Sequence, residues 1–439
     1  MPLPGESYFL ALAPNPKPFV SLGLPFDVSC VHHATNTFHA SRIYLIVSRS
    51  ISHANPAFTA LRTALGDKLV GIRHGIRQHV PWPDVLEVTS DLDRLSADLI
   101  ITLGAGSLTD GAKVATFAAA NKAFTLGALD RLHIRWGDDG KTEKKPVTIP
   151  TINIPTSLSG GEYNSPGGAT DLRNGIKSSF QHPSIGAQLV ILDPALTVST
   201  PEKVWLSSGM RAVDHCVEGL TSIGLREGGR GNEKVEGYCV KGLRLLLPNL
   251  LVTKNNPGDL ETRRSEMLGV IEAFRGLTSG VLPMGASHGI GHQLGPLGVG
   301  HGETSCVMLP SVLRWNLKNA AGGEEREWVE ERQRKVLDVF WGDATVAEAL
   351  EQRGLSRETA GAGDVVGAFV AALGLPTTLK EVGIGRDKLE GLAKNTMTDR
   401  CIPTNPVAID NEGQLLEILE LALGDGSGAH SAFPLQNAE

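Results

Sequence analysis

The feature that most constrains the fold is an apolar run that ends in a glycine-rich turn. The sequence ADLIITLGAGS covers 97–107, and the apolar helical pattern LTDGAKVATFAAA follows directly over 108–120. This order predicts a buried strand, a tight turn and a helix. Similar signals predict a helix over 55–65 and further strands over 42–49, 68–73, 147–157 and 188–194. Strands and helices that alternate in this way are typical of a parallel α/β sheet.

The pattern changes after residue 200, where helical periodicity replaces the alternation. We predict helices over 202–224, 234–252, 258–280, 283–294, 305–320, 324–341, 345–353, 360–373, 386–396 and 412–423. Pro201 is a suitable boundary, because proline commonly marks the start of a helix. We therefore expect an α/β domain over 1–200, an all-helical domain over 201–439 and a ligand in the cleft between them. The polar segments 134–146 and 424–439 are expected to be exposed or mobile.

Composition narrows the class of protein. The net charge of −7 and the aromatic content of 5% argue against nucleic-acid binding, which usually needs a basic or stacking surface. No run of about 18 apolar residues occurs, so no transmembrane helix and no membrane partner are expected. The scattered cysteines include no Cys-x-x-Cys pair; they are Cys30, Cys216, Cys239, Cys306 and Cys401. This cysteine usage fits a reducing compartment, and the opening MPLPGESYFLALAP lacks a basic region, so we expect a cytoplasmic protein without a signal peptide.

The glycine turn LGAGSLTDGAK carries the first candidate binding residues. The backbone N–H groups of Gly104, Gly106 and Ser107, at the positive end of the following helix, suit a pyrophosphate group. Asp110 falls in the first turn of that helix. The alternative is a tight turn that binds no ligand, because the full Gly-x-Gly-x-x-Gly pattern is absent.

A second loop, IPTSLSGGE over 154–162, is rich in small polar residues. Thr156, Ser157 and Ser159 offer hydroxyl groups, and the glycine pair that follows lets a ligand approach the backbone closely. These groups suit contacts with ribose, phosphate or the nicotinamide amide. A plain polar loop would have a similar composition, so this alternative stays open.

Histidines recur in the helical half of the chain. His288 and His292 are four residues apart and share a helix face, and His301 follows after a glycine-rich loop. Imidazoles at this spacing can bind a metal ion. A metalloprotease is excluded, because its motif needs Glu directly after the first histidine and this chain has Gly289.

The helical pattern GMRAVDHCVEG over 209–219 raises a specific question. It places Arg211, His215 and Glu218 on one helix face, with Asp214 beside them. An inward-facing histidine can be a metal ligand, but an arginine one turn earlier would repel a cation.

The motifs GAGSLTDGAK, IPTSLSGGE, ILDPALT, GMRAVDHCVEG and HGIGHQLG…GHGE follow one another in a fixed order. In this order the chain resembles the iron-containing alcohol dehydrogenase superfamily, from about residue 30 to residue 423. Its PTSLSGGE and HGET…MLP segments are most similar to the maleylacetate reductase branch. The resemblance implies a dinucleotide-binding α/β domain, an all-helical domain as in dehydroquinate synthase-like proteins, NAD(P)H-dependent reduction and a homodimer.

The resemblance also implies roles for individual residues. The residues that match the nucleotide site are Gly104, Gly106, Ser107, Asp110, Lys113, Thr156 and Ser157. Lys177 matches a lysine that reaches the cleft, and His292 matches a histidine near the reacting carbon. The residues that match three ligands of a divalent iron or zinc ion are His215, His288 and His301.

Two departures from the family pattern affect these roles. The fourth metal ligand is Asp in metal-dependent members and tends to be Asn in maleylacetate reductases, whereas this chain has Arg211. We hypothesise that its guanidinium replaces the metal and binds a substrate carboxylate or enolate, while His288, His292 or His301 transfers the proton. Two alternatives stay open: a metal held by the histidines with Asp214 or water, or a reshaped site in which Arg211 only pairs with a neighbouring carboxylate.

The second departure concerns the nucleotide. The strand end at Ser48 lacks the acidic residue that would bind the ribose 2′-hydroxyl of NAD, and Arg49 suits a 2′-phosphate, so both NAD(H) and NADP(H) stay open. The leading functional prediction is a reductase of a small, carboxylate-bearing unsaturated oxo-acid or carbonyl compound. A non-redox lyase, dehydratase or cyclase on the same scaffold is one alternative, and a non-catalytic nucleotide-binding protein is another.

Overall fold

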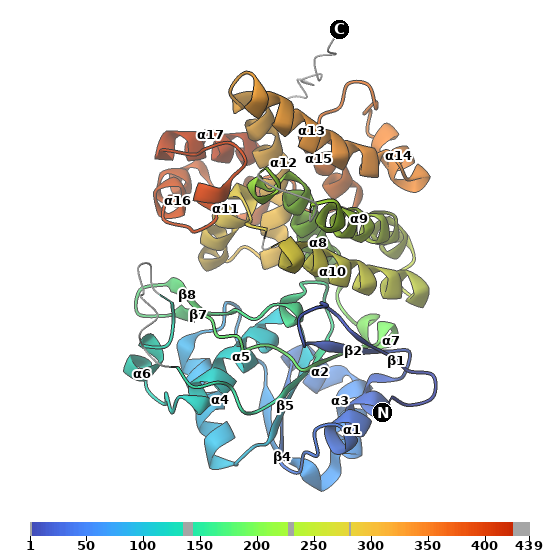
Figure 1. Cartoon of the computed structure of the whole chain (residues 1–439), viewed down its shortest axis with the longest axis vertical. Helices are drawn as coiled ribbons and strands as arrows, with labels where there is room; N and C mark the ends of the chain where they lie inside the picture. Colours follow the sequence, from blue (N-terminus) through green and yellow to red (C-terminus); the bar gives the residue numbers. More distant parts are fainter. Residues whose placement is uncertain (1, 135–143, 227–231, 281, 425–439) are drawn as a thin grey trace. The chain divides into compact units, whose positions relative to one another are not determined.

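The computed structural model describes residues 2–134, 144–226, 232–280 and 282–424. The chain separates into two compact units, Met1–Thr200 and Pro201–Glu439, and each is described by itself (Figure 1). The segments expected to be exposed or mobile are 134–146 and 424–439, and of these, residues 135–143 and 425–439 lie outside the described residues.

The first unit is built on a seven-stranded sheet with the order β1-β2-β9-β6-β5-β3-β4. Its strands are β1 (Ser7–Leu10), β2 (Phe19–Leu22), β3 (Ile43–Val47), β4 (Leu69–His74), β5 (Leu99–Gly104), β6 (Thr151–Pro155) and β9 (Leu189–Leu192). All neighbouring strands are parallel except β1 and β2, which form an antiparallel hairpin. The strands β3, β5 and β6 are buried at every position, which explains their unbroken apolar runs.

Helices cover both faces of this sheet. They are α1 (Phe26–Asn36), α2 (Arg49–Ala54), α3 (Pro56–Leu65), α4 (Trp82–Arg94), α5 (Gly106–Ala120), α6 (Leu126–Asp130) and α7 (Pro194–Thr197). Side chains of β3 alternate between two cores, because successive residues of a strand point to opposite faces. Tyr44 and Ile46 pack with α4 and α5, whereas Ile43, Leu45 and Val47 pack with α1 and α3.

The α/β prediction for this unit is confirmed, and the structure adds elements that the sequence did not indicate. A separate antiparallel hairpin joins β7 (Gly167–Asp171) and β8 (Ile176–Phe180). This hairpin packs against α5 through β7. The helix predicted over 55–65 is present as α3, and the chain between β3 and α3 forms the additional short helix α2.

The second unit is helical throughout its described residues, as predicted. Its α-helices are α8 (Glu202–Thr221), α9 (Asn232–Asn255), α10 (Leu260–Gly280), α11 (Ala286–Leu294), α12 (His301–Asn319), α13 (Glu324–Phe340), α14 (Ala344–Glu351), α15 (Ala362–Ala372), α16 (Leu389–Thr396) and α17 (Glu412–Leu423). None of the helices in the described part of the chain is long and apolar enough to cross a bilayer.

The central helix of the second unit is α8, which packs against α9, α10 and α12. Every residue of α8 from Trp205 to Thr221 is buried. Four of these carry a charged or imidazole side chain, namely Arg211, Asp214, His215 and Glu218, and buried polar groups are costly unless they are paired. The partners of these four side chains define the candidate site.

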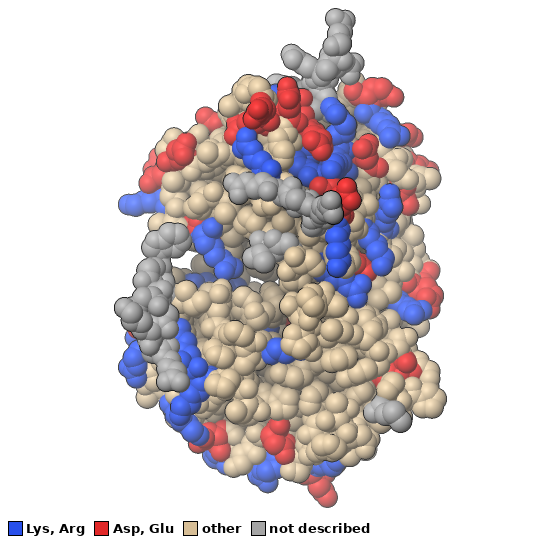
Figure 2. All heavy atoms as spheres, in the orientation of Figure 1, with Lys and Arg blue, Asp and Glu red and all other residues tan. Residues whose placement is uncertain are grey.

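Charged side chains of both signs lie close together on the surface. On the face drawn in Figure 2, Asp and Glu alternate with Lys and Arg over the helical unit. A surface of mixed sign produces no extended positive field for a nucleic-acid backbone.

Candidate functional site

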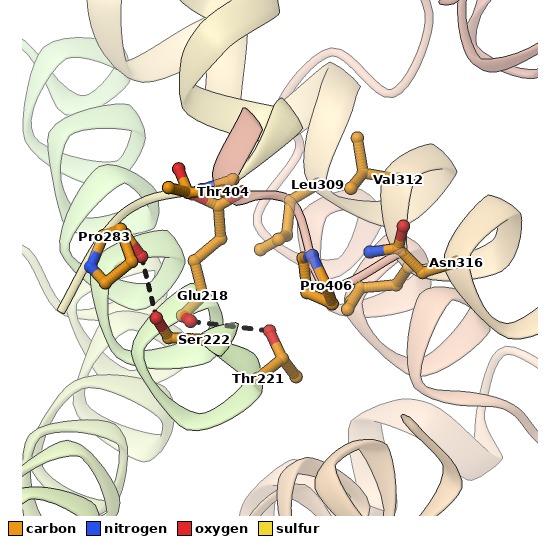
Figure 3. Close-up of a pocket in the computed structure, with 11 residues that line it drawn as sticks. Glu218, Thr221, Ser222, Pro283, Leu309, Val312, Asn316, Thr404 and Pro406 are labelled. Atoms are coloured by element: carbon orange, nitrogen blue, oxygen red, sulfur yellow. Dashed lines mark hydrogen bonds between the residues drawn. The ribbon is translucent and has the colours of Figure 1, made fainter. Parts of the chain in front are cut away.

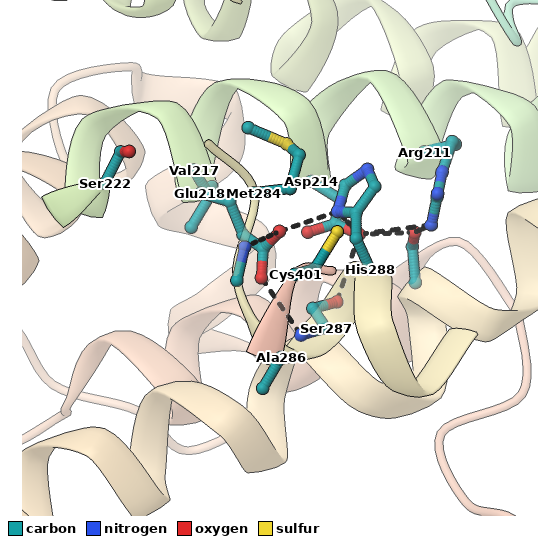
Figure 4. A network of polar contacts seen from close by, with 12 residues as sticks. Arg211, Asp214, Val217, Glu218, Ser222, Met284, Ala286, Ser287, His288 and Cys401 are labelled. Atoms are coloured by element: carbon teal, nitrogen blue, oxygen red, sulfur yellow. Dashed lines mark hydrogen bonds and ion pairs between the residues drawn. The ribbon is translucent and has the colours of Figure 1, made fainter. Parts of the chain in front are cut away.

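One carboxylate oxygen joins three helices in the second unit (Figure 4). Asp214 Oδ2 on α8 accepts hydrogen bonds from Ser287 Oγ on α11 at 3.1 Å and from Ser305 Oγ on α12 at 2.5 Å. The same oxygen lies 3.7 Å from Arg211 Nη1 and 3.5 Å from His288 Nδ1. Burial raises the pKa of Asp214, although His288 and Arg211 oppose this shift. Asp214 is therefore the electrostatic centre of the network.

The Arg211 side chain is only 3% exposed. Its Nη1 donates to Ser305 Oγ at 3.0 Å, and its Nε has no hydrogen-bond partner among the described residues. A Cβ added to Gly291 on α11 would lie 3.6 Å from Nη1, so the guanidinium reaches the histidine-bearing helix. Burial lowers the pKa of Arg211, against the attraction of Asp214 and Glu218, but a guanidinium stays charged in proteins. The site therefore contains a buried fixed cation with an unused donor.

Glu218 holds one side of the His288 ring. His288 Nδ1 lies 2.6 Å from Glu218 Oε2, and the carboxylate also accepts from the backbone N–H groups of Ser287 at 3.0 Å and Gly285 at 3.1 Å. Burial raises the pKa of Glu218 to about 7. Burial, reinforced by Arg211, lowers the pKa of His288 well below its usual range. His288 is therefore a neutral, oriented imidazole whose Nε2 finds no partner in the described part of the chain.

His215 lies beside His288. The two ring centroids are 4.9 Å apart, and the edge of Phe274 contacts His215 with a centroid distance of 5.1 Å. His215 Nδ1 is buried and has no hydrogen-bond partner within the described ranges. Burial, with the neighbouring His288 and Arg211, lowers the pKa of His215 well below its usual range. Two neutral imidazoles with unused nitrogens therefore lie next to the guanidinium.

His292 forms a second, less buried pair with Asp399. Its Nδ1 lies 2.9 Å from Asp399 Oδ2, and the other carboxylate oxygen accepts from the Cys401 backbone N–H at 2.9 Å. Burial acts to raise the pKa of Asp399, but the hydrogen bond and the charge of His292 outweigh it and lower the pKa. Asp399 was absent from the sequence predictions, because it follows α16 in a segment without a recognisable motif. The pair has the form of an imidazole oriented by a carboxylate.

His301 differs from His215 and His288 in its exposure. It is exposed at the first position of α12. Among the described residues, two sets of three side chains bring potential metal ligands within 4.8 Å of one another: Asp214, Glu218 and His288, and His292, Asp399 and Cys401. The three ligands suggested by the sequence, His215, His288 and His301, do not form such a set.

A small cavity lies behind Glu218 (Figure 3). Its polar lining includes Thr221, Ser222, Asn316 and Thr404. Its volume of about 10 Å³ is at the lower limit for holding one water molecule. The cavity is therefore too small to hold a substrate.

In the first unit, three segments converge on the glycine turn. Gly104 has a φ of +151°, and a Cβ there would lie 2.9 Å from Ser48 Cβ at the end of β3. A Cβ on Gly106 would lie 2.9 Å from Ser159 Oγ, which is itself 3.1 Å from Ser157 Oγ. Gly104 therefore faces the end of β3, and Gly106 faces the loop after β6. Because neither glycine has a side chain, a ligand can approach the backbone of the turn.

The other predicted nucleotide residues lie around this turn. The Thr156 backbone N–H donates to the Gly104 carbonyl at 3.1 Å. Across the hairpin, a Cβ on Gly168 would lie 2.4 Å from Lys177 Cε and 3.5 Å from Asp110 Oδ2. Lys177 is exposed on β8. The structure thus brings together the nucleotide candidates and Lys177 in the first unit, and Arg211, His215 and His288 in the second.

Lys113 fixes the loop that follows β6. Its buried Nζ donates to the Gly161 carbonyl at 2.5 Å, to Asn164 Oδ1 at 2.5 Å and to the Pro166 carbonyl at 3.0 Å. Burial lowers the pKa of Lys113, against the attraction of Asp110 and other carboxylates. One ammonium group therefore satisfies three acceptors in the loop that carries the candidate serines.

Replacing Lys113 by methionine is expected to lower the free energy of unfolding by about 3 kcal/mol, because three buried acceptors would lose their donor. Chemical denaturation followed by circular dichroism measures this change. The matched control is Lys122→Met, since Lys122 is 67% exposed and pairs only with Asp93 in the ion pairs of the described residues. The control is expected to change stability by less than about 0.5 kcal/mol. Equal stability of the two variants would contradict the role of Lys113.

Comparison with known proteins identifies relatives of the whole chain. The family described as "Iron-containing alcohol dehydrogenase" matches residues 26–194, and "Fe-containing alcohol dehydrogenase family, C-terminal" matches residues 205–423. Dehydrogenase ALT3 of Alternaria alternata is 46% identical over 394 residues, covering 88% of this chain and 100% of that protein. Maleylacetate reductase 1 of Cupriavidus pinatubonensis is 26% identical over 347 residues, covering 79% of this chain and 80% of that protein.

A solved structure shows the same fold. Maleylacetate reductase from Rhizobium sp. strain MTP-10005 aligns with a TM-score of 0.68 and 22% sequence identity. The alignment covers 96% of this chain and 99% of the other. The arrangement of an α/β unit followed by a helical unit is therefore shared along the full length.

Proposed function

The chain belongs to the iron-containing alcohol dehydrogenase family, on its maleylacetate reductase-like branch, and we propose that it uses NADH or NADPH to reduce a small unsaturated oxo-acid or carbonyl compound. It is an oxidoreductase, as its family and relatives establish, so the non-redox and non-catalytic alternatives are set aside. The observation that carries the proposal is the buried Arg211 guanidinium, which has an unused donor and lies near His288 (Figure 4), whose ring contacts that of His215.

The guanidinium suits the charge that forms during reduction. Addition of hydride to a carbonyl carbon leaves negative charge on oxygen, and addition to a conjugated double bond leaves an enolate. A fixed cation in a buried site stabilises such charge strongly, because no water has to reorganise. The planar donors of Arg211 also match a carboxylate, so we propose a carboxylate-bearing substrate.

The proton that completes the reduction is assigned to His292. Its ring is held by Asp399 at 2.9 Å, and a carboxylate in this position orients an imidazole and stabilises its protonated form. His288 is the less suitable donor, because burial and Arg211 keep it neutral. The assignment gives the helical unit both an anchor for the anion and a source of the proton.

The family implies an iron or other metal ion, but Arg211 makes the buried part of the site around Asp214 unfavourable for one. Arg211 already lies against Asp214, and a divalent ion about 5 Å from a guanidinium would be repelled by about 7 kcal/mol at an effective dielectric constant of about 20. Asp214 Oδ2 is also engaged by two serine hydroxyls. We therefore propose that Arg211 replaces the metal and that the reduction does not depend on one.

We further propose that the enzyme works in the cytoplasm as a homodimer. The five cysteines of the sequence are all buried and unpaired, as is usual for proteins in a reducing compartment. The dimer rests on the family resemblance.

Activity with and without chelator tests this function. The purified chain is mixed with NADH or NADPH and a series of small unsaturated oxo-acids, and the absorbance of the reduced nicotinamide is followed. We expect nucleotide consumption that a divalent-metal chelator does not slow, and substoichiometric metal by elemental analysis. Stoichiometric iron or zinc whose removal abolishes activity would contradict metal-free reduction. Absence of nucleotide binding would contradict the proposed reductase itself.

A further inference from the structure

The carboxyl end of β3 directly borders the glycine turn. The Ser48 backbone N–H donates to the Leu103 carbonyl at 2.9 Å, and a Cβ on Gly104 would lie 2.9 Å from Ser48 Cβ. In dinucleotide-binding sheets, the residues at the end of the strand beside the glycine turn meet the ribose of the adenosine half. If the pyrophosphate binds at Gly104, this ribose therefore meets the residues that follow β3.

No acidic side chain lies in the segments that directly follow β3 and β4, and the first ones after β4, Asp84 and Glu87 on α4, pair with Arg73. The sequence has no Asp or Glu over 42–66 and none over 68–83. The one acidic residue between these stretches, Asp67, precedes β4 and so lies at the opposite end of that strand. Sites selective for NADH use an acidic side chain here to accept a hydrogen bond from the ribose 2′-hydroxyl. These segments offer no such acceptor.

The same edge carries a positioned cation and hydroxyl groups. Arg49 Nε donates to the His74 carbonyl at the end of β4, at 3.3 Å. The side chain lies along Gly75, where an added Cβ would come within 2.8 Å of Arg49 Cγ. Ser48 Oγ and Ser50 Oγ lie 3.2 Å apart beside it. The guanidinium is therefore held at the carboxyl ends of β3 and β4 while the residue stays exposed.

We propose that the nucleotide is NADPH and that Arg49 binds its 2′-phosphate, with the hydroxyls of Ser48 and Ser50 as further donors. The inference rests on the proposed function and specifies its cofactor. A 2′-phosphate carries up to two negative charges, and a guanidinium can bind it with two parallel hydrogen bonds. The segments directly after β3 and β4 also contain no carboxylate, whose negative charge would repel the phosphate.

Direct titration of the full-length protein tests the preference without any substrate. NADPH or NADH is added, and the change in nucleotide fluorescence gives each dissociation constant. We expect NADPH to bind about tenfold or more tightly, a difference of about 1.4 kcal/mol. This advantage should shrink as the salt concentration rises, because the phosphate contact is exposed.

Two variants and one control test which residues determine the preference for NADPH over NADH. Arg49→Ala is expected to weaken NADPH binding about tenfold and to change NADH binding less than about twofold. Ser48→Asp is expected to reverse the preference, since it supplies the missing carboxylate. The control is Arg62→Ala on α3, which removes an exposed arginine that stacks on Phe58 and should leave both affinities unchanged. Thermal melting of each variant checks that it is folded.

The possible outcomes separate the two proposals. Equal or tighter binding of NADH by the native protein would overturn the NADPH inference and leave the reductase intact. An equal loss of affinity for NADPH and NADH in Arg49→Ala would also overturn this inference, because Arg49 would then contact a group that both nucleotides share. If neither nucleotide binds, the proposed function fails and the inference fails with it.

Discussion

Replacing Arg211 by methionine is expected to lower kcat/KM about a thousandfold while nucleotide binding stays unchanged. Methionine has a similar length but no charge, so the developing oxyanion or enolate would lose its buried cation. Loss of one uncharged donor from such a site typically costs about 3–4 kcal/mol of transition-state stabilisation, and a charged donor in a buried site should cost at least as much. Steady-state kinetics with NADPH and fluorescence titration of the nucleotide measure the two quantities.

Arg211→Lys separates the charge from the geometry. Lysine keeps the positive charge but lacks the planar pair of donors, so an intermediate loss of about tenfold to a hundredfold is expected. Stability also needs a check, because Asp214 would lose a cationic neighbour. Burial already raises the pKa of Asp214, so in Arg211→Met this carboxyl should take up a proton, which limits the destabilisation. Wild-type kcat/KM in Arg211→Met would rule out the proposed anion anchor.

Replacing His292 by alanine is expected to lower kcat by about a hundredfold or more, with a much smaller effect on nucleotide affinity. Asp399→Asn should reduce kcat less, by about tenfold, because the imidazole remains but loses the carboxylate that favours its protonated form. The double variant should be no slower than His292→Ala alone, since the two residues act as one unit. Kinetics of the three variants measure this coupling.

The pH dependence of kcat gives an independent readout of the same pair. A proton-donating imidazole is lost as pH rises, so kcat should fall on the alkaline side. In Asp399→Asn the fall should begin at lower pH, because the ion pair that also lowers the pKa of Asp399 is gone. The control is His32→Ala on α1, which lies outside both candidate sites and should keep the wild-type profile. Strictly additive losses or an unshifted profile would exclude the pair as the proton source.

The sequence predicted the central sheet and the helical unit well, because their signals are local. Strands buried on both faces, such as β3 and β5, appear as continuous apolar runs. The hairpin of β1 and β2 escaped prediction, since its strands have only four residues each and β2 joins the sheet through β9, which is distant in sequence. The helix α4 was also missed, although its buried Val85, Val88 and Leu92 follow a helical spacing.

The candidate site was predictable where it lies on one helix. Helical geometry alone groups Arg211, His215 and Glu218, and the structure confirms that all three are buried on α8. The hydroxyl partners and Asp399 come from other elements, and their approach depends on tertiary packing that periodicity does not encode. The prediction that His301 is a metal ligand stays untested; this residue is exposed at the start of α12, whereas His215 and His288 are buried.

The junction of α8, α11 and α12 at Asp214 constrains how this enzyme can evolve. The oxygen that positions Arg211 also ties α11 and α12 to α8 through two serine hydroxyls. A substitution that retunes the chemistry at this point therefore loosens the scaffold as well, and stability and reactivity cannot be optimised separately there. New substrate preferences should arise more readily from side chains outside the junction. The most buried part of the site should thus stay fixed while its periphery diversifies.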